Sequence, residues 1–107
     1  KNLDKLLNLF AKHKQINKIA KLLEELVRSY PNDFGLRDRL AKLYQQLGRK
    51  MEAIAQLDAL GELQLESGLN SEARNTIKRI IALQPDNVDD YRRLLVKLGT
   101  TSNLEQQ

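Results

Sequence analysis

Apolar residues recur along most of this chain at intervals of three and four positions, the spacing that gives an α-helix one apolar face. Polar or turn-forming residues interrupt the spacing several times. The periodic segments predict six helices, at about residues 2–12, 16–30, 34–47, 50–66, 72–84 and 88–98. No segment alternates apolar and polar residues with a period of two, so the sequence predicts an all-α fold.

Several short signals mark the ends of these helices. The polar stretch 13–15 separates the first two. Four residues that stop helices fall between the later segments: Pro31, Gly48, Gly68 and Pro85. Asp33 can cap the helix that follows it through its side-chain oxygen. The last predicted helix ends at Gly99, and Ser102 followed by Glu105 predicts the start of a further helix.

A fourteen-residue pattern occurs twice, displaced by twenty residues. The first copy consists of Leu40-Ala41, Tyr44, Gly48 and Glu52-Ala53, and the second of Leu60-Gly61, Gln64, Gly68 and Glu72-Ala73. A large residue beside a small one, followed by a glycine and then Glu-Ala, describes two helices that are joined by a tight turn and packed at their small residues. Such internal repetition is typical of a helical-repeat scaffold.

The second copy and the residues after it resemble a tetratricopeptide repeat, a helix-turn-helix unit of about 34 residues with a proline after its second helix. The best match covers residues 54–87. The residues that carry it are Leu57, Leu60, Gly61, Gln64, Gly68, Ala73, Ile77, Ile80 and Pro85. Residues 34–53 match the first part of another repeat, residues 2–31 a degenerate repeat, and residues 88–98 the first helix of a truncated one.

The resemblance implies a single domain over residues 1–107, in which about three repeats form a right-handed superhelical array of antiparallel helix-turn-helix hairpins. One repeat is irregular. Pro31 and Pro85 are 54 residues apart, which is less than the length of two repeats. The helix at 50–66 must therefore end one repeat and begin the next, and its apolar circumference also predicts neighbours on more than one side.

Proteins that this chain resembles usually bind partners on the concave surface formed by the first helices of successive repeats. By that resemblance the candidate groove residues are Asn8, Lys12, Asp38, Lys42, Gln45, Gln46, Asp58, Glu62, Asp89 and Arg92. The residues expected to let helices pack closely, or to end them, are Ala41, Gly48, Ala53, Gly61, Gly68, Ala73 and Pro85. We therefore expect a non-catalytic interaction scaffold that binds a peptide or a protein surface.

The net charge of +4 is unevenly distributed. Residues 1–30 carry seven Lys or Arg and three acidic residues, whereas residues 51–73 carry five acidic residues and no Lys or Arg. Nucleic-acid binding by the two basic N-terminal helices is an alternative function, but the aromatic residues that would stack on bases mostly fall on apolar faces. A further alternative is a structural module that self-associates through the last helix, by Tyr91, Leu94, Leu95 and Leu98.

Residues that could support catalysis or bind a metal are few. His13 is the only histidine, and the chain has no cysteine. Asp58, Glu62 and Glu66 form a carboxylate row on one helix face, but neither a histidine nor a Gly-rich phosphate loop accompanies them. We therefore expect no enzyme activity and no bound metal or cofactor.

The longest apolar runs have only a few residues, whereas a membrane-spanning helix needs about 20. The N-terminus has no signal pattern, and the absence of cysteine fits a reducing compartment. We expect a cytoplasmic protein that does not enter a membrane. Because the sequence begins with Lys1 and not with methionine, we also expect it to be part of a longer protein.

Overall fold

A computed structural model describes the backbone of residues 2–106 and the side chains of residues 5, 7–9 and 11–99. Over this range the chain forms five α-helices: α1 (Asn2–Ser29), α2 (Phe34–Gln46), α3 (Lys50–Glu66), α4 (Asn70–Ala82) and α5 (Val88–Gln106). No strand occurs among these residues, so the prediction of an all-α fold is confirmed for the described part of the chain. The predicted number of six helices is wrong.

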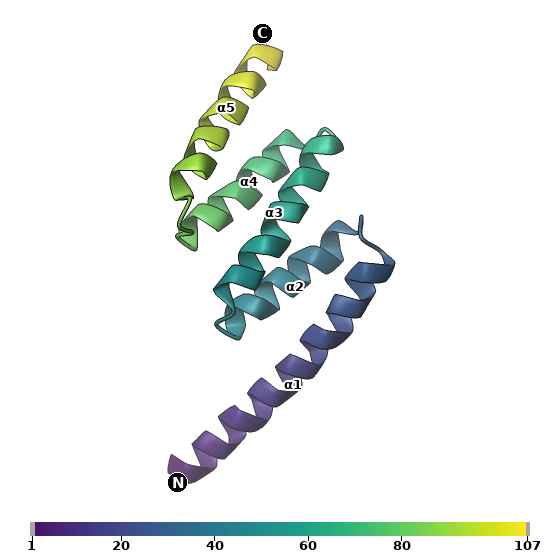
Figure 1. Cartoon of the computed structure of the whole chain (residues 1–107), viewed down its shortest axis with the longest axis vertical. Helices are drawn as coiled ribbons and strands as arrows, with labels where there is room; N and C mark the ends of the chain where they lie inside the picture. Colours follow the sequence, from purple (N-terminus) through teal and green to yellow (C-terminus); the bar gives the residue numbers. More distant parts are fainter. Residues whose placement is uncertain (1, 107) are drawn as a thin grey trace.

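The helices follow one another in an antiparallel zigzag, and each packs against the next one in the chain (Figure 1). α3 lies in the middle, with α2 and α4 both packed against it. The array is elongated, with extents of 61 × 30 × 21 Å, and α1 and α5 form its two ends. This arrangement gives α3 two helical neighbours along its length.

α1 is one continuous helix, although the sequence predicted a break at residues 13–15. No proline or glycine occurs before Pro31, so nothing in this segment removes a backbone donor or strongly disfavours helical backbone. Apolar residues recur on one helix face before residues 13–15 and on another face after them. The helix itself continues through this stretch. The prediction was wrong because a change of face was interpreted as a boundary between two elements.

α5 also continues beyond its predicted end. It passes through Gly99 and reaches Gln106, so no separate helix begins near Ser102. A glycine inside a helix costs only about 1 kcal/mol relative to alanine, which is too little to end the helix by itself. The side chains of Ser102 and Glu105, which suggested a capping box, lie outside the described residues.

The twenty-residue repeat of the sequence corresponds to two turns of the same geometry. Gly48 and Gly68 adopt φ angles of 73° and 77°, in the left-handed region that favours glycine. In each turn the glycine N–H donates to the carbonyl three residues earlier at 3.1 Å, and the next N–H donates to the carbonyl five residues before it at 2.8 Å. This pair of bonds is the Schellman motif, which satisfies the last carbonyl groups of a helix.

Corresponding residues of the two copies are also buried alike. The buried residues are Leu40, Ala41, Tyr44 and Ala53 in the first copy and Leu60, Gly61, Gln64 and Ala73 in the second. The first copy spans α2 and the start of α3, and the second spans α3 and the start of α4. α3 therefore acts as the second helix of one unit and as the first helix of the next.

The core is divided into two clusters that meet at α3. One contains Ala20, Leu23, Val27, Leu40, Tyr44 and Ala53. The other contains Ala41, Ile54, Leu57, Leu60 and Ile80. Ala53 and Ile54 are adjacent in sequence but belong to different clusters, so α3 is buried on more than one side, as its apolar circumference predicted.

Candidate binding cleft

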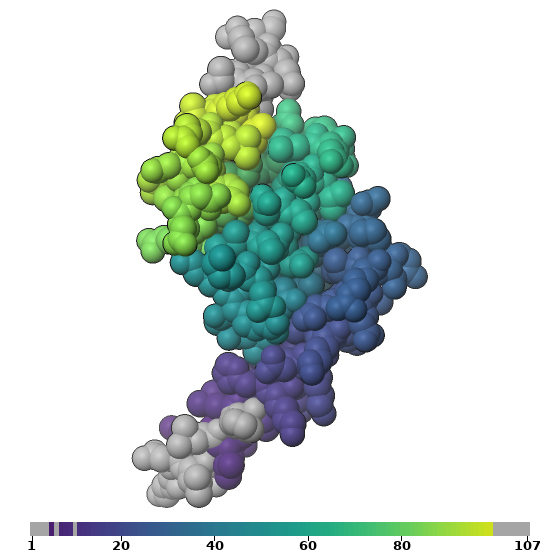
Figure 2. Space-filling view, in the orientation of Figure 1, coloured from purple at the N-terminus to yellow at the C-terminus, as the bar shows by residue number. Residues whose placement is uncertain are grey.

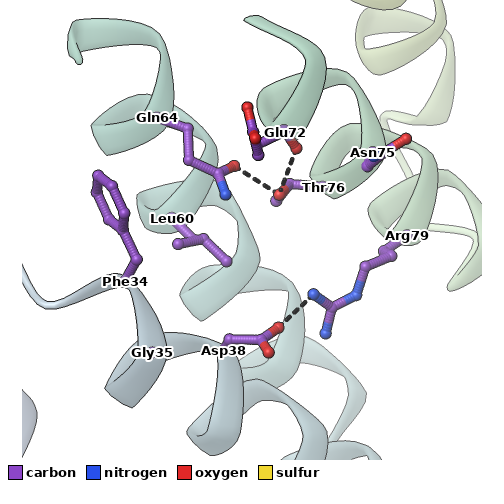
Figure 3. A pocket seen from close by; sticks show the side chains of 9 residues that line it. All are labelled: Phe34, Gly35, Asp38, Leu60, Gln64, Glu72, Asn75, Thr76 and Arg79. Atoms are coloured by element: carbon purple, nitrogen blue, oxygen red, sulfur yellow. Dashed lines mark hydrogen bonds and ion pairs between the residues drawn. The ribbon is translucent and has the colours of Figure 1, made fainter. Parts of the chain in front are cut away.

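A cleft with a volume of about 310 Å³ opens between α2 and α4, beside the C-terminal half of α3 (Figure 3). Residues from all three helices line it: Phe34, Gly35 and Asp38 from α2, Leu60 and Gln64 from α3, and Glu72, Asn75, Thr76 and Arg79 from α4. The cleft thus brings together two helices that are not consecutive in the chain. It is the candidate functional site.

The first turn of α2 is held by two hydrogen bonds. Asp33 is the N-cap residue and accepts a bond from the Leu36 N–H at 3.1 Å, as the sequence predicted. Arg37 Nε donates to the carbonyl oxygen of Pro31 at 2.9 Å. Because these contacts secure the start of the helix, they also position the half-buried ring of Phe34 at the edge of the cleft.

The inner surface of the cleft combines an apolar residue with a buried polar pair. Leu60 is 2% exposed. The Thr76 hydroxyl donates to Gln64 Oε1 at 2.6 Å, and Thr76 Oγ1 also lies 3.0 Å from the carbonyl oxygen of Glu72. A buried polar side chain costs free energy unless it is hydrogen-bonded, so this pair stabilises the contact between α3 and α4.

An ion pair crosses the cleft between α2 and α4. Arg79 Nη1 donates to Asp38 Oδ1, although the two residues are 41 positions apart. Lys42 Nζ lies 3.2 Å from the other carboxylate oxygen of Asp38. Partial burial by itself would raise the pKa of Asp38, but the hydrogen bonds and charges of Arg79 and Lys42 outweigh it and hold the pKa below its ordinary value.

Several groups in the cleft could contact a ligand. Arg79 has five N–H donors, and its ion pair with Asp38 occupies one terminal nitrogen. Asn75 is exposed, and its amide group offers both a donor and an acceptor. The ring of Phe34 offers an apolar surface next to Leu60. The cleft can therefore accommodate a ligand that has both polar and apolar groups.

The structure distributes the predicted groove residues over several places. Asp38 lines the cleft, and Lys42 is connected to it through the ion pair. Asn8 and Lys12 lie far from it in the chain, on the N-terminal half of α1, where Lys12 and Gln46 line a separate hollow. The others are Gln45 at the end of α2, Asp58 and Glu62 on α3, and Asp89 and Arg92, which form an ion pair on the exposed side of α5.

The residues predicted for self-association lie on α5. Tyr91 is half-buried and packs against the cluster that contains Leu57 and Ile80. Leu94, Leu95 and Leu98 are half-buried as well. Since α5 packs against α4, part of its apolar surface is already covered within the chain.

Sequence reasoning did not identify Phe34, Asn75 or Arg79 as candidates. Asn75 and Arg79 are four positions apart on α4, a spacing that places both on one helix face and could have indicated a shared surface. That signal is weak, because polar residues recur at this spacing on any exposed helix face. The resemblance also directed attention to the first helices of successive repeats, whereas Asn75 and Arg79 lie on α4, which corresponds to the second helix of the best-matching repeat.

The described part of the chain belongs to the all-α class. It consists of successive antiparallel helices with a cleft beside the central helix, α3. Comparisons with protein-family models, with curated proteins and with solved structures give no match for this chain. Among the described residues, no helix combines the length and apolar character that crossing a membrane requires.

Proposed function

We propose that this chain is a non-catalytic, tetratricopeptide-like scaffold that binds an extended peptide segment of another protein in the cleft between α2 and α4. The observation that carries the proposal is that three successive helices contribute apolar, amide and charged side chains to one open cleft. Binding surfaces usually combine a few apolar anchors with polar groups that set specificity. This cleft has both.

Each part of the cleft corresponds to a part of a peptide. Phe34 and Leu60 can receive one apolar side chain. The Asn75 amide can pair with a backbone N–H and carbonyl of the peptide. The donors of Arg79 that its ion pair leaves available can bind a carbonyl or a carboxylate oxygen.

The tetratricopeptide-like assignment is supported by the repetition of the turns. Gly48 and Gly68 end α2 and α3 with the same hydrogen bonds, and Ala53 and Ala73 are fully buried at corresponding places. Repeated units of this kind build extended binding surfaces, because each unit adds to the same face as its neighbour.

Selection of phage-displayed random peptides against the whole chain would test this function. Peptides obtained in this way are synthesised and titrated calorimetrically against the wild type and the Asn75→Ala and Arg79→Ala variants. We expect both substitutions to weaken binding by about fivefold or more, the size of a contact worth at least about 1 kcal/mol.

The matched control is Lys78→Ala, which removes a positive charge from an exposed residue of the same helix that does not line the cleft. It should leave the affinity unchanged. If the selected peptides bind all of these variants as tightly as the wild type, the cleft is not their binding site and the proposed function is wrong.

A further inference from the structure

α1 is about twice as long as the helix that it packs against. At about 1.5 Å per residue, the 28 residues of α1 span roughly 42 Å, whereas the 13 residues of α2 span roughly 20 Å. The N-terminal half of α1 therefore extends beyond the end of α2 (Figure 1). In the space-filling view, the described residues of this segment, coloured purple, project from one end of the molecule (Figure 2). We refer to residues 5–16 as the overhang.

The side of α1 that packs against α2 continues into the overhang. Leu9 and Ile16 fall on the same helix face as the buried residues Ala20, Leu23 and Val27. Ile16 is half-buried near the end of α2, and Leu9 is 55% exposed. Leu9 thus lies on the face that holds α1 to α2, but beyond the residues that cover this face.

Two lysines, Lys5 and Lys12, lie beside Leu9. One hollow of the overhang is lined by Lys5, Asn8, Leu9 and Lys12, and the next by Leu9, Lys12, His13, Ile16 and Gln46. The overhang contains three lysines, Lys5, Lys12 and Lys14, and no acidic residue. The overhang therefore presents an exposed apolar side chain, Leu9, beside two positive charges.

α3 presents a surface of opposite charge, which also carries an exposed apolar side chain. Met51, Ala55, Asp58 and Glu62 recur at helical spacing on one face and are all exposed, with Met51 at 72%. They belong to the interval 51–73, which has five acidic residues and no Lys or Arg. We refer to these four residues as the acidic face. α3 reaches the molecular surface between α1 and α5 in the view of Figure 2.

We propose that this chain self-associates by packing the overhang of one copy onto the acidic face of a second copy. The overhang is basic and the acidic face is negatively charged, so the two surfaces are complementary in charge. Each also carries an exposed apolar side chain, Leu9 on the overhang and Met51 on the acidic face. Opposite charges favour the encounter and fix its register, while the apolar contact supplies affinity. A second copy is the occupant because both complementary surfaces lie on this one chain.

Such a contact is heterologous, since it joins two different surfaces. A copy that lacks one surface can still use the other. This property permits a test in which two defective variants complement each other. The overhang variant carries Lys5→Glu and Lys12→Glu, and the face variant carries Asp58→Lys and Glu62→Lys.

Sedimentation velocity over a range of concentrations is the measurement. We expect the wild type to associate at low salt and to dissociate as salt is added, because exposed charges are screened. Each variant alone should associate at least about tenfold more weakly than the wild type. An equimolar mixture of the two variants should associate, because the unchanged overhang of the face variant meets the unchanged acidic face of the overhang variant, and the two reversed surfaces are complementary in charge as well. A chain with all four substitutions should associate again.

Two control variants distinguish this contact from a general effect of net charge and from changes in the peptide cleft. Arg39→Glu combined with Lys78→Glu reverses two exposed positive charges outside both surfaces and should associate like the wild type. Arg79→Ala alters the peptide cleft and should also leave association unchanged, so failure of the cleft hypothesis would not affect this one. Circular dichroism of each variant checks that it remains helical.

Three results would overturn the proposal. The first is a wild type that remains monomeric at every concentration and at low salt. The second is association that persists in both variants, which would indicate another surface such as α5. The third is a mixture that stays monomeric although both variants are helical, which would show that the overhang and the acidic face do not meet.

Discussion

The guanidinium of Arg49, in the turn between α2 and α3, lies 4.6 Å from the centre of the Tyr44 ring. Tyr44 is 4% exposed, and its hydroxyl is hydrogen-bonded with the Glu24 carboxylate of α1. Arg49 also forms an ion pair with Glu52 in the first turn of α3. A cation–π contact of this kind contributes about 0.5–2 kcal/mol, depending on its exposure. These four side chains connect three consecutive helices.

The first prediction concerns the stability of the fold at alkaline pH. Burial, and after it the hydrogen bond with Glu24, raises the pKa of Tyr44 from 10.0 to about 12. The folded state therefore holds the phenolic proton more tightly than the unfolded state does. This stabilisation is complete below pH 10 and is lost as the pH rises through about 12, and it amounts to about 3 kcal/mol.

Denaturant unfolding of the wild type and of Tyr44→Phe across this pH range measures the effect. The phenylalanine variant is the control, because it keeps the ring but has no proton to lose. The difference in stability between the two proteins should shrink above pH 10. Parallel losses in both proteins would contradict the prediction.

The second prediction concerns the glycine inside α3. Gly61 is buried against α4, and a β-carbon added there would lie 3.7 Å from Thr76 Cγ2, an ordinary van der Waals contact. Gly61→Ala should therefore fit and should stabilise the protein by about 0.5–1 kcal/mol, since alanine favours the helix more than glycine does. Gly61→Leu has no such room and should lower the thermal midpoint by several degrees. Calorimetry measures the thermal midpoints. A lower midpoint for the alanine variant would show that α3 and α4 lie closer together at Gly61 than the 3.7 Å spacing allows.

The third prediction follows from the equivalence of the two turns. Gly48→Ala and Gly68→Ala should each destabilise the protein by about 1–2 kcal/mol, because alanine disfavours a positive φ angle. No atom within 4 Å would obstruct either β-carbon, so the cost comes from the backbone alone. The control is Gly99→Ala in α5, which also has open space but no positive φ and should not destabilise the protein. Denaturation midpoints that differ widely between the two turn variants would refute the equivalence.

The fourth prediction concerns the end of α4. Gln84 adopts a φ of 56°, which is unfavourable for a residue with a β-carbon, and Pro85 follows it and has no N–H to complete a Schellman motif. The Gln84 carbonyl accepts a hydrogen bond from Lys50 Nζ at 2.8 Å. Gln84→Gly should raise the free energy of unfolding by up to about 1 kcal/mol. Lys50→Met should lower it by about 0.5–1 kcal/mol. Urea titrations check both values, and a destabilised glycine variant would contradict the argument.

Local features of the sequence were sufficient to predict the helical class and the ends of α2 and α3. Gly48 and Gly68 end these helices because the left-handed backbone there favours glycine, a preference that does not depend on the rest of the fold. The break at residues 13–15 and the end at Gly99 were predicted wrongly for a related reason. The polar stretch interrupts the apolar pattern, and the single glycine lowers the helix propensity. Both keep their backbone N–H groups, so neither ends the helix.

The sequence by itself determined that this chain forms helices, that two of its turns are equivalent, and that α3 is buried on more than one side. Only the tertiary structure decided which side chains share a surface. Asp38 and Arg79 form an ion pair although 41 positions separate them, and Phe34 and Asn75 line the same cleft. The physical reason is that helical spacing places side chains on a face of one helix, whereas a cleft depends on how several helices are rotated and packed against one another.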